Sequence, residues 1–392
     1  MLPAESHWFS DEEEFPATRT LLQLIRRRNW DACKYRLLTY PWDARYQEKY
    51  GNSSTCLHLA CLHRAPREVV EMLADAYPKA LLTQDTEGWT PIHLCLLYGA
   101  DEDVSVMLIR RGGAPAASLQ SRFVGTPLHL ACRHGSSLRI LKEIVSANCL
   151  MAECPNETGL KPLAFIWNNF VRNPENADII QQLRLTGKWT NFNSADLVGN
   201  RNVEELIGRV QVLVQAVNQQ GYAYPEGLGG NSTNFTHDLI KFQEKLGDMS
   251  HFIPLAVHLF PHEVRQTDCD GNAALHLAAS TPAIVPKPHN YSRYHTPSDD
   301  PLETLVEAYP EAAGLKNRNG EIPLMLALSQ GRRTWSSGVA SLVQHEPEVL
   351  LQYDKSSLLY PFQLASAFPA DEEEESTTTI LELLLACPHA LQ

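Results

Sequence analysis

The amino-acid sequence predicts an all-α fold, a solenoid of stacked helix-turn-helix units separated by short finger turns. Two observations carry this prediction. A Pro is repeatedly followed by a Gly ten residues later, as in Pro41/Gly51, Pro78/Gly88, Pro115/Gly125, Pro261/Gly271 and Pro310/Gly320. A short Leu-rich segment then follows the Gly, as in Thr90-Pro91-Ile92-His93-Leu94-Cys95. Self-similarity at a fixed period is the signature of a repeat array, whose core grows unit by unit.

Each unit predicts an inner helix, a turn and an outer helix. In the unit that begins at Pro78, Thr90 can cap the inner helix and Pro91 suits its first position, where a missing N–H costs nothing. Gly99 ends that helix, and the apolar run from Val104 to Ile109 predicts the outer one. We expect the stretch between Pro78 and Gly88 to be an extended linker that ends in a turn.

The repeated phrase resembles the ankyrin repeat, whose T-P-L-H-x-A signature is matched best by Thr126-Pro127-Leu128-His129-Leu130-Ala131. The resemblance covers the chain from about residue 40 to its end. Pro41, Pro78 and Pro115 lie 37 residues apart, longer than the family's period of about 33. It implies a protein-binding array with a concave surface of fingers and inner helices. It also implies that the motif histidines bridge neighbouring repeats through hydrogen bonds to backbone.

The order of these signals predicts seven segments. They are a disordered acidic N-terminus (1–17), a helical cap (18–40), repeats (41–167), an insertion (168–200), degenerate and regular repeats (201–280), an insertion loop (281–300) and C-terminal repeats (301–392) with an acidic loop at 369–377. The insertions follow an inner helix and precede an outer one, the loop that a solenoid lets grow. Residues 149–225 fit either one repeat with an insertion or two degenerate repeats.

Composition narrows the class of partner. The chain has 392 residues, 44% of them hydrophobic, and a net charge of −13, which disfavours nucleic acid and anionic membranes as partners. Its nine cysteines are scattered, with no C-x-x-C pair, and no secretory or membrane-spanning stretch is apparent. We therefore expect an intracellular protein, in the cytoplasm or also the nucleus, with other proteins as partners. The oligomeric state stays open.

Catalytic and metal chemistry find little support in the sequence. The four motif histidines His58, His93, His129 and His276 are interpreted as structural. The metal-ligand types Cys56, His58, Cys61 and His63 share one helix at spacings that cannot converge on a single ion. The Gly-rich stretch at 227–230 lacks the lysine and spacing of a phosphate-binding loop. We predict no cofactor, no metal and no catalytic residue.

The predicted partner-binding residues lie at the finger tips. Trp89 stands out because we expect its slot to face solvent, where an aromatic residue either packs on the next finger or contacts a partner. The other candidates share the finger position: Asp85, Glu87, Arg122, Phe123, Asp268, Asp270, Asn317, Arg318 and Asn319.

Three functions remain to be compared. The first is a non-catalytic scaffold that binds a protein on its concave surface. The second is a targeting or regulatory subunit that bridges a client to an enzyme through its insertions. The third, an enzyme with a site between residues 165 and 250, has the least support.

Overall fold

The computed structural model describes residues 16–48, 51–186, 192, 197–221, 234–282, 300–329, 331–370 and 373–387. Within these ranges the chain is helical and has no β-strand, only isolated bridges such as Gln47 with Thr55 and Ser121 with Gly125. The predicted all-α repeat fold is therefore confirmed. The chain divides into two compact units, Met1–Asn169 and Phe170–Gln392.

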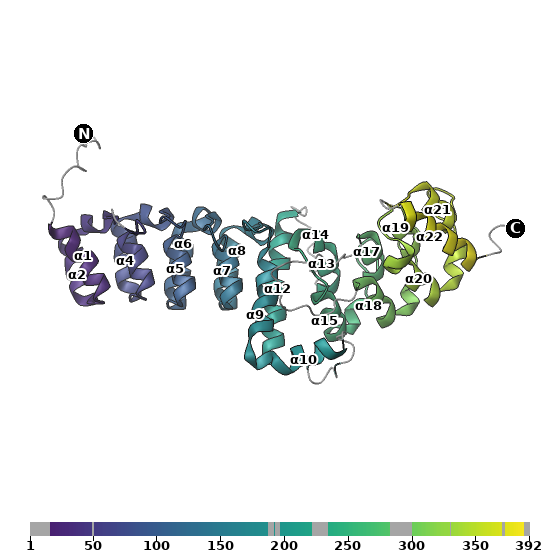
Figure 1. The fold of residues 1–392 in the computed structure, drawn as a ribbon, viewed down its shortest axis with the longest axis horizontal. Helices are drawn as coiled ribbons and strands as arrows, with labels where there is room; N and C mark the ends of the chain where they lie inside the picture. The colour runs from purple at the N-terminus through teal and green to yellow at the C-terminus, as the bar shows by residue number, and fades with distance from the viewer. Residues whose placement is uncertain are drawn as a thin grey trace. The chain divides into compact units, whose positions relative to one another are not determined.

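Unit 1 is a series of helix pairs that stand side by side (Figure 1). Its helices are α1 (Pro16–Arg26), α2 (Trp30–Thr39), α3 (Cys56–Leu62), α4 (Arg67–Ala76), α5 (Pro91–Tyr98), α6 (Glu102–Ser118), α7 (Pro127–His134), α8 (Leu138–Ala147) and the start of α9 (Pro162–Arg172). Inner helix α5 packs against α3 on one side and α7 on the other. The core runs between the pairs, where Leu57, Leu128 and Leu130 are at most 1% exposed.

Unit 2 contains helices of more varied length, from the four residues of α14 to the 21 of α12. They are α10 (Ala177–Thr186), α12 (Arg201–Gly221), α13 (Phe235–Lys241), α14 (Gln243–Leu246), α15 (Phe252–Leu259), α16 (Pro261–Val264), α17 (Ala274–Ser280), α18 (Pro301–Ala308), α19 (Pro323–Ser329), α20 (Ala340–His345), α21 (Pro361–Ala367) and α22 (Glu373–Ala386). A π-helical turn, Trp335–Val339, precedes α20. Inner helix α19 packs between α17 and α21.

The linkers begin with a helical turn before the chain becomes extended, as at Thr83, so the expectation of fully extended linkers is partly wrong. They form the 3-10 helices η1 (Pro41–Arg45), η2 (Pro78–Leu82), η3 (Cys149–Ala152), η6 (Pro310–Gly314) and η8 (Pro347–Leu351). Pro favours this outcome because its fixed φ suits the first position of a helical turn, where its missing N–H is not needed. At Pro115 the turn merges with α6 across a kink at Gly113.

The predicted acidic loop at 369–377 is also partly wrong. Glu373, Glu374 and Glu375 form the first turn of α22. Carboxylates are favourable there because the unpaired N–H groups at a helix N-terminus carry partial positive charge. Residues 371 and 372 lie outside the described residues.

The other segment boundaries fall as follows. Of the predicted disordered N-terminus, only residues 16 and 17 are described, and they begin α1. Of the 168–200 insertion, the structure describes the end of α9, a 3-10 turn at Pro174–Asn176, α10 and residues 192 and 197–200. The 281–300 insertion lies outside the described residues except for residues 281, 282 and 300.

Candidate functional site

The motif histidines join each inner helix to the next finger. His58 accepts a hydrogen bond at Nδ1 from the Thr55 backbone N–H, 3.2 Å away, and Nδ1 also lies 2.7 Å from Thr55 Oγ1. Its Nε2 lies 3.0 Å from the backbone carbonyl of Trp89. Because Nδ1 accepts from an N–H, the proton sits on Nε2, which donates to that carbonyl.

The same geometry recurs at three further helices. The Nε2 atoms of His93, His129 and His276 each lie 3.1 Å from a backbone carbonyl in the following finger, that of Gly125, Leu160 and Leu315 respectively. Burial lowers the pKa of His93 and of His129 to about 4. With both ring nitrogens engaged, these side chains hold the stack together and offer no nitrogen to a substrate or metal.

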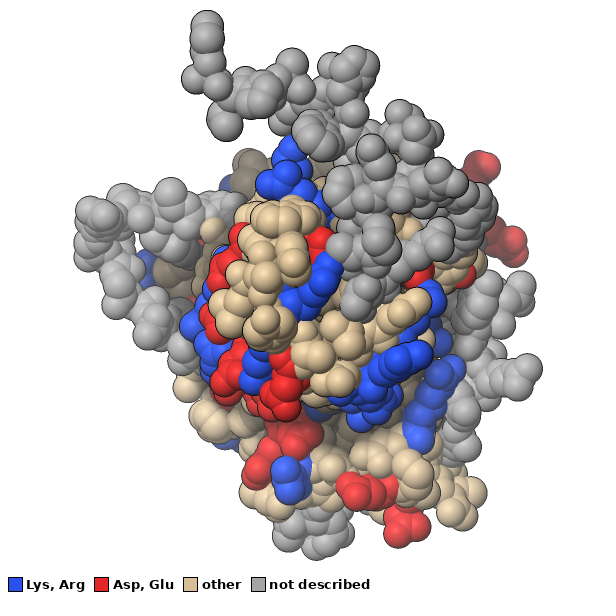
Figure 2. Space-filling view, turned by 90° about the vertical axis from the view of Figure 1, so that its left-hand side faces the viewer, with Lys and Arg blue, Asp and Glu red and all other residues tan. Residues whose placement is uncertain are grey.

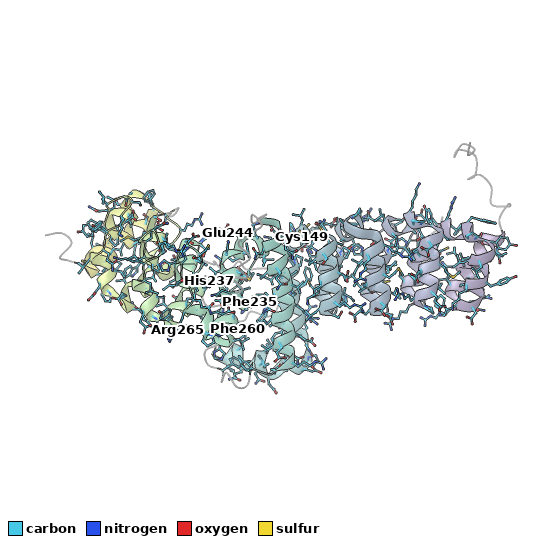
Figure 3. All side chains as sticks on the ribbon, turned by 180° about the vertical axis from the view of Figure 1, so that it is seen from behind. Cys149, Phe235, His237, Glu244, Phe260 and Arg265 are labelled. Atoms are coloured by element: carbon cyan, nitrogen blue, oxygen red, sulfur yellow. The ribbon has the colours of Figure 1, made fainter. Side chains whose placement is uncertain are left out.

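A fifth histidine of this kind was missed in the sequence. His237 on α13 places Nε2 3.2 Å from the carbonyl of Asn272, while its Nδ1 has no hydrogen-bond partner. Asn234 stands at the capping position and accepts from the His237 backbone N–H at 3.1 Å, as Thr55 does for His58. The signal was present, because a capping Thr three positions before the His also marks the start of the inner helices that carry His58, His93 and His129. Figure 3 labels His237 beside Phe235, whose ring meets Phe260 edge-on at 6.0 Å.

The side chains of three predicted partner-binding residues accept hydrogen bonds within their own turns. Asp85 Oδ1 accepts from the backbone N–H groups of Glu87 at 2.9 Å and Trp89 at 2.8 Å. Asp268 and Asn317 hold their fingers in the same way. A short polar side chain that bonds the backbone two to four residues on fixes such a turn. The chain therefore uses Asp85, Asp268 and Asn317 to shape the fingers.

Trp89 does not face solvent, so the expectation of an exposed slot is wrong. Its side chain is 8% exposed, and its indole N–H donates to Glu87 Oε2 at 3.0 Å. The indole also meets the His93 ring edge-on, with centroids 5.7 Å apart. The ring is covered by its own finger and inner helix, an arrangement that sequence spacing does not reveal.

The remaining candidates are exposed at the finger tips: Glu87, Arg122, Phe123, Asp270, Arg318 and Asn319. Backbone hydrogen bonds connect neighbouring tips. The Arg122 N–H donates to the Glu87 carbonyl at 3.1 Å in unit 1, and the Arg318 N–H donates to the Asp270 carbonyl at 3.0 Å in unit 2. The structure thus brings Glu87 together with Arg122 and Phe123, and Asp270 together with Arg318 and Asn319. Phe123 is 67% exposed on this fixed tip.

Comparison with known proteins agrees with this geometry. The sequence model of a family described as ankyrin repeats, in many copies, matches residues 37–95. That segment holds α3, α4 and most of α5, with the bridging histidines His58 and His93. This segment of the chain consists of ankyrin repeats.

One similar protein is much longer than the segment that it shares with this chain. Tyrosine-protein kinase HTK16 from Hydra vulgaris is 35% identical over 109 residues, which make up 27% of this chain and 14% of the kinase. The chain thus spans about a seventh of that protein's length. Ankyrin repeats are typically non-catalytic and generally mediate protein–protein interactions.

Other kinds of site were sought among the described ankyrin helices and fingers. In that part of the chain, no group of three or more His, Cys, Asp or Glu side chains is placed to hold a metal ion. No helix in the same ranges combines the length and apolar character needed to cross a bilayer.

Proposed function

We propose that this protein is a non-catalytic scaffold that binds another protein on the concave surface formed by its fingers and inner helices. The observation that carries the proposal is the tip formed by Glu87, Arg122 and Phe123. An aromatic ring and a guanidinium group stand exposed on backbone that is hydrogen-bonded to its neighbour. Aromatic and arginine side chains are enriched among the residues that dominate binding energy.

The rigidity of the finger tips supports their assignment as the binding surface. The tips are held by Asx side chains, by tip-to-tip backbone bonds and by the histidine bridges beneath them. A preformed surface loses little conformational entropy on association, so more of the contact energy appears as affinity.

Site-specific photo-crosslinking tests the proposal. A photoreactive amino acid is placed at Phe123 and, as a control, at Tyr35, an exposed aromatic on α2 that is 73% exposed. We expect a protein that crosslinks from position 123, is absent from position 35, and is lost when Arg122→Ala is added. The same set of products from both positions, or none from position 123, would contradict concave-face binding.

We propose the targeting or regulatory subunit as a second function, because the two ends of the 281–300 insertion are fixed by one buried side chain. Arg333 is 2% exposed and donates to the Thr281 carbonyl at 3.0 Å and to Asp300 Oδ2 at 2.5 Å. A segment with anchored ends is suited to present a second contact.

Deleting residues 283–299 while keeping Arg333 and Asp300 separates the two functions. The scaffold keeps its crosslink at position 123 and loses no other partner. The bridging subunit keeps that crosslink and loses a co-purifying enzyme.

A further inference from the structure

Two neighbouring turns at the start of unit 1 concentrate unpaired positive charge. The α1–α2 turn contributes Arg27 and Arg28, and the α3–α4 turn contributes His63 and Arg64; we call these four residues the basic edge. Arg27, Arg28 and Arg64 are exposed, and no carboxylate among the described residues pairs with them. Helix α1 packs against α3 and α2 packs against α4, which sets the two turns side by side. Burial, followed by the charges of Arg28 and Arg26, lowers the pKa of His63, so the positive charge of the basic edge comes from its three arginines.

Arginines on the outer helices are arranged differently. Arg111 on α6 contacts Glu71 and Asp75 of α4, at 3.0 and 2.5 Å. Arg139 on α8 lies 2.7 Å from Asp103, and Arg110 pairs with Glu143. These cations connect adjacent repeats and are neutralised there. The arginines of the basic edge make no such ion pairs between repeats with described residues. Their positive charge is exposed on a chain whose net charge is −13.

The backbone at the basic edge is unfavourable for arginine. Arg28 and Arg64 each have φ of 56°, in the left-handed region. Each follows an inner helix, and the next residue closes the helix end through a bond to an earlier carbonyl, as Ala65 does to Ala60 at 2.9 Å. The equivalent residues after α5 and α7 are Gly99 and Gly135, with φ of 65° and 66°. Glycine takes this conformation without the steric cost that a side chain carries.

Arginine thus stands at two positions where the fold itself favours glycine. Residues kept in a disfavoured backbone conformation often serve a function that offsets their strain. Figure 2 looks onto the molecule from the side on which α1 and α2 lie, and it shows Lys and Arg side chains gathered on one flank and mixed charges on the other.

We propose that the basic edge binds an acidic polypeptide segment of a partner protein, on a surface separate from the concave face. Guanidinium groups pair with carboxylates through charge-assisted, often bidentate hydrogen bonds. An extended segment can follow two adjacent turns. The next turn along the stack carries Asp101, Glu102 and Asp103 and begins beside Arg64, since a Cβ added at Gly99 would lie 3.7 Å from Arg64 Nη2. Its negative charge opposes a broad anionic membrane surface.

The test uses the full chain and a fluorescent poly-glutamate peptide, with binding followed by fluorescence anisotropy at low and at physiological salt. We expect the wild type to bind at low salt and to weaken as salt rises, because the contacts are exposed charges. The variant Arg28→Gly/Arg64→Gly should bind about tenfold more weakly. The charge-matched control Arg172→Gln/Arg201→Gln should bind within about twofold of wild type, since both arginines are exposed and belong to unit 2.

The melting temperature distinguishes a variant that has lost binding from one that has lost its fold. Because glycine suits both positions, the melting temperature of Arg28→Gly/Arg64→Gly should stay unchanged or rise by up to about 4 °C. Weaker binding together with a lower melting temperature would contradict the proposal, since the arginines would then be structural. Equal loss of binding in the control variant would also overturn it, as would binding to phosphatidylserine vesicles without binding to the peptide. Phe123→Ala should leave peptide affinity unchanged, so this test and that of the concave face fail independently.

Discussion

At the scale of single residues, the bridging histidines couple proton binding to folding. Four of them place Nε2 against a carbonyl of the next finger and Nδ1 against their own capping backbone N–H. Only a neutral ring can accept at Nδ1 and donate at Nε2 at once. Protonation at Nδ1 therefore breaks the bond with the capping N–H and adds charge to a buried site.

The loss of stability at acidic pH should depend on these histidines. The pKa of His93 and of His129 is about 4 in the folded chain, below the ordinary value of 6.5. Between these values the unfolded chain binds more protons, so the free energy of unfolding should fall as pH drops from 6.5 towards 4. Urea denaturation of His129→Gln should show a weaker dependence in this window. His262→Gln, which changes an exposed histidine, should match the wild-type slope; an equal effect from both would contradict the assignment.

Arg333 should be among the most sensitive residues of unit 2. Besides Asp300 and Thr281, it donates to the carbonyls of Ala278 at 3.1 Å and Ser337 at 3.0 Å. Breaking a buried charge pair costs about 3–5 kcal/mol because the partner charge stays buried. We expect Arg333→Met to lower the free energy of unfolding of unit 2 by that amount. Its neighbour Arg332 is exposed, and Arg332→Met should cost less than about 0.5 kcal/mol in the same urea titration.

At the scale of elements, the sequence predicts the inner helices well because their signals are local. A capping residue, a Pro at the first helical position and a left-handed Gly after the last turn all act within a few residues, as at Thr126, Pro127 and Gly135. The start of the linkers was predicted incorrectly because Pro is compatible with both an extended chain and a 3-10 turn. Tertiary packing decides between them, as where η1 and η2 both pack against α4.

The candidate site likewise combines features that local sequence signals predict with features that depend on tertiary packing. The fingers could be located from the Gly spacing, but the burial of Trp89 depends on its bond to Glu87 and its contact with His93. The acidic residues 373–375 resemble a solvated loop until the apolar residues that follow are paired with α21. Features that depend on such tertiary contacts cannot be predicted from the sequence pattern.

Truncation of an inner helix should be costly. Leu128 on α7 is fully buried, and Leu128→Ala should lower the free energy of unfolding of unit 1 by about 2–5 kcal/mol, through lost contacts and a residual cavity. Phe123→Ala, five residues beyond α6 and exposed, should change it by less than about 0.5 kcal/mol. Equal midpoints in urea for both variants would refute the proposed packing.

At the scale of the whole molecule, the chain has two compact units, and the division falls inside α9. In a repeat protein, stability is close to a sum of the stabilities of the repeats and of the interfaces between neighbours. A local defect therefore spreads along the stack only as far as successive interfaces remain strong.

Hydrogen exchange can follow that spread. In Leu128→Ala, amides of α5 and α7 should lose protection because they pack directly on one another. Amides of α17 and α19 in unit 2 should exchange at wild-type rates. Uniform acceleration across both units, measured by mass spectrometry of peptides, would show that the chain unfolds as one cooperative body.

The bonds between finger tips have a consequence for the evolution of binding. They join only main-chain atoms, the Arg122 N–H to the Glu87 carbonyl and the Arg318 N–H to the Asp270 carbonyl. Any residue other than proline at these donor positions supplies the same N–H. The side chains at these two donor positions are therefore free to vary in charge, size and shape while the main-chain bonds persist. A lineage can exchange one partner for another by point substitution, without passing through an unfolded intermediate.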